Sequence, residues 1–134
     1  MAKRWDERIS DYENALERLK ESIEESKIIN SSTIRDGVIQ RFEFTLELSW
    51  KVMKFFLNSE GLMDAKAPRS TIRTGFNNEI IKDAKLWIDM IEDRNLTTHT
   101  YSQSISDEIY EKIVSSYYGE LKKFFLEIKD KEVE

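Results

Sequence analysis

The sequence predicts an all-α protein, an antiparallel up-and-down four-helix bundle with one additional short helix. Apolar residues recur at steps of three and four along most of the chain, and the connections between these stretches are short. No stretch alternates apolar and polar residues as a half-buried strand does. Long amphipathic helices with short connections form a bundle, because each helix must bury one apolar face against its neighbours.

Length and composition indicate one domain. The chain has 134 residues, 40% of them hydrophobic, which is enough for a single continuous core. We expect one domain over residues 1–134, ordered from about 5 to 130, with an acidic C-terminal tail, "KDKEVE". There is no segment of signal-peptide type and no run of eighteen apolar residues, so we expect a soluble, cytoplasmic protein with no membrane contact.

Composition also excludes several kinds of site. The absence of cysteine rules out disulfides and thiol nucleophiles, and a single histidine rules out a multi-histidine metal site within one chain. No Walker or dinucleotide motif is present, so we expect no metal and no cofactor. The formal charge of −5 argues against a broad nucleic-acid-coating surface.

The first two helices carry the clearest patterns. The first helix should end near Asn30, and its apolar stripe is formed by Trp5, Ile9, Tyr12, Leu16, Leu19 and Ile23. Thr33 and Asp36 resemble a capping box and predict the start of a second helix, the central and most buried one, which runs to Ser59. A charged ridge on this helix is interpreted as a solvated face rather than a metal site or an acid/base pair, and also as a surface that could dock a partner; it comprises Glu43, Glu47, Lys51 and Lys54.

The second half of the chain predicts three more helices. Gly61 ends the central helix, residues 60–68 form the main loop, and Pro68 opens a short helix that Ser70 or Thr71 could cap. Asp83 caps a fourth helix, and one last helix spans the stripe from Ile105 to Ile128, which is formed by Ile105, Ile109, Ile113, Tyr117, Leu121, Phe124 and Ile128. Three Trp, five Tyr and seven Phe exceed what one small bundle buries, which favours a homodimer.

Two groups of residues are candidates for function. Lys66, Arg69 and Arg73 surround Pro68 and could bind RNA, ATP phosphates or an acidic partner, or form a solvated loop. In "RNLTTHTY", the only histidine, His99, follows Arg94 by five residues. We expect the helix to break at Asn95 and restart at Thr97 or Thr98, so that both side chains aim at one point. A structural role for this histidine, as a cap or a packing residue, stays open.

The residues Arg94, Asn95, His99 and Tyr101 resemble the Arg-x4-His-x-Tyr motif of HEPN-domain proteins. More narrowly, "RFEFTLELSWKVMKFFL", "APRSTIRTGF" and "DRNLTTHTYS" together resemble the nucleotidyltransferase substrate-binding protein family, which is similar to the HepT toxins. The resemblance covers roughly residues 5 to 120.

The resemblance implies a HEPN-like four-helix-bundle homodimer that belongs to a toxin–antitoxin pair and has a cognate minimal nucleotidyltransferase as its partner. It also implies metal-independent cleavage of RNA, with His99 as the acid or base and Arg94 on the phosphate. Asn95 orients the phosphate or holds the helix end, and Tyr101 accepts AMP from the partner or is a packed tyrosine. The alternatives are a non-catalytic substrate-binding subunit and a purely structural bundle.

Overall fold

The computed structural model describes residues 4–99 and 102–133, without the side chains of Thr98 and His99. These residues form helices and no strand, which confirms the predicted all-α class. The elements in chain order are α1 (Trp5–Ile28), α2 (Ser32–Ser59), α3 (Pro68–Asn77), α4 (Ala84–His99), α5 (Gln103–Lys112), the π-helical turn η1 (Ile113–Tyr117) and α6 (Tyr118–Ile128).

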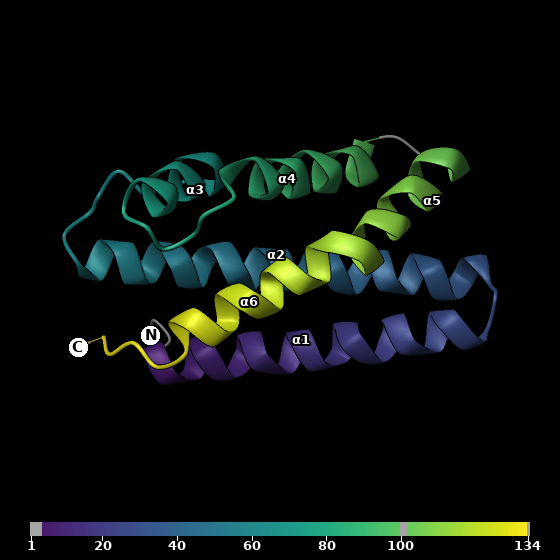
Figure 1. The fold of residues 1–134 in the computed structure, drawn as a ribbon, viewed down its shortest axis with the longest axis horizontal. Helices are drawn as coiled ribbons and strands as arrows, with labels where there is room; N and C mark the ends of the chain where they lie inside the picture. Colours follow the sequence, from purple (N-terminus) through teal and green to yellow (C-terminus); the bar gives the residue numbers. More distant parts are fainter. Residues whose placement is uncertain (1–3, 100–101, 134) are drawn as a thin grey trace.

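The elements form four antiparallel arms (Figure 1). α1 and α2 make one long hairpin, α3 and α4 follow each other along α2, and α5, η1 and α6 return diagonally across the bundle. α2 packs against α1, α3, α4, α5 and α6, so it is the central helix that the sequence predicts. No helix among the described residues has the length and apolar character that crossing a membrane would require.

Three of the predicted boundary signals have the expected role. Asp83 caps α4, since its Oδ1 accepts the Leu86 N–H at 3.0 Å. Gly61 adopts a left-handed φ of 85°, and the Leu62 N–H that follows it donates to the Leu57 carbonyl at 3.0 Å, which closes α2. Pro68 opens α3 as predicted, but the N-cap is Ala67, so Ser70 and Thr71 lie inside the helix, where the Ser70 hydroxyl accepts the Ala67 N–H at 3.0 Å.

The predicted capping box at Thr33 and Asp36 is wrong. α2 begins one residue earlier, and Ser31 is its N-cap, with its hydroxyl accepting the Ile34 N–H at 3.5 Å. "NSST" offers several competing cap residues, and the serine before the first helical turn supplies the acceptor. Thr33 then lies inside the helix and is exposed.

The single last helix that the sequence predicts contains a π turn. Its apolar residues recur at steps of four from Ile105 to Leu121, and each such step advances about 40° around a regular α-helix. Four steps would carry the stripe about 160° away from the core. In η1, the Tyr118 N–H donates instead to the Ile113 carbonyl five residues back, and this wider turn keeps Ile113, Tyr117 and Leu121 all buried.

Gly75 marks the close approach of α3 to α2. A Cβ atom at this position would lie 2.6 Å from the Sδ atom of Met53, which is fully buried. We expect Gly75→Ala to lower the free energy of unfolding by about 1–2 kcal/mol, because overpacking outweighs the gain in helix propensity. Gly37→Ala on α2 is the matched control, since nothing lies within 4 Å of its added Cβ. Chemical denaturation should show the control to be stabilised by about 0.5–1 kcal/mol; the same gain in both variants would contradict the overpacking.

Candidate functional site

Arg94 lies on an unbroken helix. α4 runs without interruption through His99, so the helix break predicted at Asn95 is wrong. The Thr97 hydroxyl donates to the Arg94 carbonyl at 2.7 Å, inside the helix. Thr97 therefore does not cap the start of a new helix. Because each residue advances 100°, the helix positions of Arg94 and His99 lie about 140° apart. One α4 helix therefore presents the two positions in different directions.

Asp93, a carboxylate with only 6% of its surface exposed, helps to fix the rotation of α4 together with the fully buried Trp87 and Met90. The Tyr117 hydroxyl in η1 donates a short hydrogen bond to Asp93 Oδ2, and Lys112 Nζ in α5 lies 3.2 Å from the same oxygen. Burial and the hydrogen bond to Asp93 raise the pKa of Tyr117 well above its usual value, so the hydroxyl stays protonated as a donor. With Asp93 directed at α5 and η1, Arg94 faces α2.

Two half-buried carboxylates of α2 carry negative charge toward Arg94. Burial raises the pKa of Glu43, opposed chiefly by the charge of Arg94. Burial also acts to raise the pKa of Glu47, but hydrogen bonds from Trp50 and Lys51, and the charges of Lys51 and Arg94, outweigh it and hold the pKa below its usual value. Half of the predicted charged ridge thus faces α4 and is not a solvated face.

A cavity of about 230 Å³ lies beside Arg94, between α2, α4 and the start of α3. Its polar lining is Glu47, Arg94 and Asn95, and its other lining residues are Leu46, Trp50, Pro68 and Ile91. A guanidinium at the edge of a partly apolar cavity can bind a phosphate through two parallel hydrogen bonds while the cavity holds the rest of the ligand. The arrangement is suited to a phosphorylated ligand.

The predicted basic cluster is exposed on the loop and on α3. Arg69 Nη2 lies 3.6 Å from Glu92 Oε1 of α4, and both side chains are about half exposed, so this ion pair contributes little to stability. Lys66 and Arg73 are exposed as well. Their neighbour Pro68 lines the cavity, so the start of α3 borders the Arg94 site.

The family model described as "Nucleotidyltransferase substrate binding protein like" matches residues 7–130. The chain belongs to this family. A Thermus thermophilus protein of known crystal structure is 32% identical to this chain, with a TM-score of 0.72 over 86% of this chain and 95% of that chain.

One curated protein and one further solved structure are also similar to this chain. A Haemophilus influenzae (strain KW20 / Rd) protein named "Probable ribonuclease HepT" is 33% identical over 89 residues, which cover 63% of this chain and only 61% of that relative's length. A tri-AMPylated Shewanella oneidensis HEPN toxin, solved in complex with an MNT antitoxin, has a TM-score of 0.79 at 16% identity, over 98% of this chain and 100% of that chain. At this identity the toxin shows a shared fold.

Among the motif residues of this chain, the structure brings Arg94 and Asn95 together at the cavity. The side chain of His99 and all of Tyr101 lie outside the described residues. Trp50, which also lines the cavity, was not predicted from the sequence as a site residue, because its place there depends on how α2 is rotated against α4. Its position three residues after Glu47 was the available signal, because residues at this spacing share a helix face. The described residues contain no group of His, Asp and Glu that could hold a metal ion.

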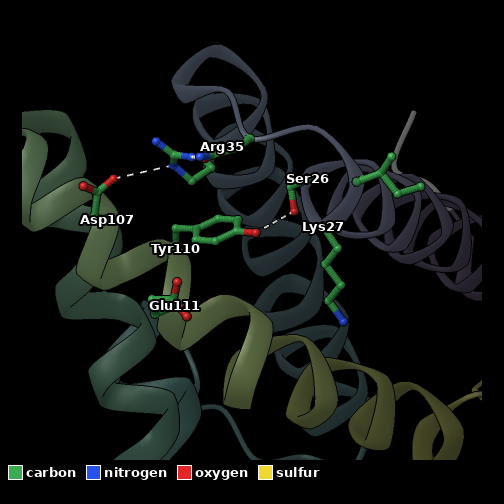
Figure 2. Close-up of a pocket in the computed structure, with 8 residues that line it drawn as sticks. Ser26, Lys27, Arg35, Asp107, Tyr110 and Glu111 are labelled. Atoms are coloured by element: carbon green, nitrogen blue, oxygen red, sulfur yellow. Dashed lines mark hydrogen bonds and ion pairs between the residues drawn. The ribbon is translucent and has the colours of Figure 1, made fainter.

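A second cavity, of about 460 Å³, lies between the α1–α2 connection and α5 (Figure 2). The hydroxyls of Ser26 and Tyr110 lie 2.7 Å apart, and Arg35 Nε lies 3.6 Å from Asp107 Oδ1. Arg35 also donates to Asn30 Oδ1 at 2.6 Å. These polar groups pair with one another across the cavity, so they tie α5 to the first hairpin.

Proposed function

We propose that this chain is a HEPN-type, HepT-like toxin: a homodimeric, metal-independent endoribonuclease controlled by a cognate minimal nucleotidyltransferase. The observation that carries the proposal is the position of Arg94, which is half-buried at the edge of a cavity and faces α2, while its neighbour Asp93 is hydrogen-bonded to Tyr117. Support also comes from the names of the relatives, a ribonuclease HepT and a HEPN toxin bound to an MNT antitoxin.

The proposed chemistry needs no metal. A base removes the proton of an RNA 2′-hydroxyl, the 2′-oxygen forms a bond to phosphorus, and the bond from phosphorus to the 5′-oxygen breaks as an acid protonates that oxygen. The products are a 2′,3′-cyclic phosphate and a 5′-hydroxyl. His99 is the proton-transfer group, since an imidazole titrates near neutral pH. Arg94 stabilises the added negative charge on the phosphorane, and Asn95 supports the phosphate.

Two chains are needed to complete such a site. The reaction uses one base and one acid, and each chain has a single histidine. The angle of about 140° between the helix positions of Arg94 and His99 also separates the two groups within one chain. A homodimer that apposes two α4 helices would supply two histidines and two arginines around one phosphate.

We propose that the partner nucleotidyltransferase controls the nuclease by modifying Tyr101. The Shewanella oneidensis toxin carries AMP groups and binds an MNT antitoxin. For this chain, the Tyr101 hydroxyl would attack the α-phosphate of ATP held by the partner, form a phosphodiester and release pyrophosphate. The AMP group would then stand two residues from His99 and block access to it. The exposed Lys66, Arg69 and Arg73 are proposed to bind RNA or this partner.

The family name supports a second candidate function, a non-catalytic subunit that presents substrate to the nucleotidyltransferase. Cleavage of RNA separates the two candidates. We expect the purified dimer to cut a mixed tRNA and mRNA pool in EDTA, and His99→Ala to be slower by about 10²–10⁴-fold, because general acid–base catalysis contributes this much. Stable binding of the nucleotidyltransferase by a folded wild-type dimer that leaves RNA intact would overturn the nuclease and favour the subunit.

A further inference from the structure

The cavity beside Arg94 has an apolar part that the cleavage chemistry does not use. Leu46 and Ile91 are buried and form its inner wall, and Trp50 is half-buried beside them. Its volume of about 230 Å³ is below the roughly 300–1,000 Å³ of sites that enclose a drug-sized ligand, so it has room for one planar ring system.

The indole of Trp50 is held in place before any ligand binds. Its Nε1 donates to Glu47 Oε2 at 3.1 Å, and the other carboxylate oxygen of Glu47 accepts from Lys51 Nζ at 3.1 Å. An aromatic side chain that is already oriented loses little conformational entropy when a flat ligand stacks on it. Base–aromatic stacking is how proteins hold single-stranded nucleic acid with little dependence on sequence.

The polar edge of the cavity suits a nucleotide better than an apolar side chain of a protein partner. Arg94 supplies a cation for a phosphate, Asn95 supplies an amide donor and acceptor, and the Glu47 oxygens have further lone pairs for an exocyclic amine. An apolar side chain would leave the charges of Arg94 and Glu47 without ligand contacts. We propose that the cavity binds one nucleobase, stacked against Trp50, of the nucleotide whose phosphate Arg94 holds.

This inference rests on the proposed function, because both place a phosphate at Arg94. The nucleotide could be part of an RNA chain or be free AMP or ATP. Comparing the binding of an RNA probe with that of AMP and ATP separates these two sources. The RNA probe is a tetramer of 2′-O-methyl adenosine, which lacks the attacking hydroxyl and stays intact. Calorimetric titration of the 134-residue protein gives the Kd of the tetramer and those of AMP and ATP. Tighter binding of the tetramer assigns the cavity to RNA; equal or tighter binding of AMP or ATP assigns it to a free nucleotide.

The decisive variants are Trp50→Ala, Trp50→Phe and Phe44→Ala. Phe44 is an aromatic of the same helix, 61% exposed and outside this cavity, so it is the matched control. We expect Trp50→Ala to weaken nucleotide binding by roughly 5- to 150-fold, Trp50→Phe to weaken it less, and Phe44→Ala to leave it unchanged. Trp50→Phe keeps an aromatic ring in the fold, so its smaller effect remains measurable if Trp50→Ala unfolds.

The inference is overturned if the folded wild type binds none of the three probes, or if the Trp50 and Phe44 variants bind alike. Loss of the nucleotidyltransferase complex in Trp50→Phe, with no nucleotide binding by wild type, would make the cavity a protein-docking site instead. The inference and the nuclease can fail separately. Trp50-dependent binding without cleavage removes only the nuclease, and cleavage with an unchanged KM in Trp50→Ala removes only the base-binding cavity.

Discussion

Replacing Arg94 by alanine should lower kcat/KM for RNA cleavage by about 100- to 1,000-fold, the loss expected when one preorganised donor to a developing negative charge is removed. Arg94 already lies at the edge of its cavity, near the charges of Glu43 and Glu47, and would face a phosphate bound there. Arg94→Lys keeps the charge but loses the planar fork of donors, so an intermediate rate is expected. Initial rates on a defined RNA measure both variants.

Lys85→Ala is the matched control for Arg94. Lys85 is an exposed cation of the same helix, paired with Asp89 at 3.0 Å, and its removal should leave the cleavage rate unchanged. A thermal melt separates loss of activity from loss of fold, because Arg94 also offsets two carboxylates. If the folded Arg94→Ala variant cleaves RNA at a rate within a few-fold of wild type, the Arg94 guanidinium does not bind the scissile phosphate. Its role is then to offset the negative charges of Glu43 and Glu47 in α2.

Replacing Asp93 by alanine should lower the free energy of unfolding by about 3 kcal/mol, as measured by chemical denaturation. The substitution leaves the Tyr117 hydroxyl buried without its acceptor and removes the partner of Lys112. Since α4 is aligned by this contact, the variant should also lose cleavage activity in proportion to the misplacement of Arg94.

Asp89→Ala gives the comparison for Asp93, because both substitutions exchange aspartate for alanine in α4. The Asp89 side chain is 39% exposed and pairs with exposed Lys85, so its loss should cost less than about 1 kcal/mol. Tyr117→Phe removes only the donor and should cost less than Asp93→Ala. Equal stability of the Asp93 and Asp89 variants would show that the buried contact does not hold α4 in place.

Local patterns predicted most of the fold because they depend on near neighbours in the chain. The stripe of the first helix, the glycine after α2 and the Asp83 cap each need only a few residues to be recognised. The start of α2 was displaced because neighbouring serines and threonines are nearly equivalent as caps. The π turn was missed because the uniform apolar steps of four from Ile105 to Leu121 resemble the stripe of a regular α-helix, although such steps drift by about 40° each.

The site was predictable as a motif but not as an arrangement. Arg94 and Asn95 do share a cavity, but the expected helix break between Arg94 and His99 does not exist. The sequence could not show that Asn95 would lie inside a continuous helix, since this depends on the contacts that α4 makes with α2, α5 and η1. The same contacts bring Trp50 to the site from another helix, at a separation of more than forty residues.

The π turn couples the length of the last arm to the orientation of α4. It accommodates one residue more than a regular helix would between Ile109 and Leu121, and Tyr117 of this turn holds Asp93. Inserting a further residue here would turn every later side chain by about 100°, away from the core, whereas deleting one would restore a regular helix and remove the turn that brings Tyr117 to Asp93. This short segment therefore tolerates substitution of its exposed Ser115 and Ser116 far better than any change in its number of residues.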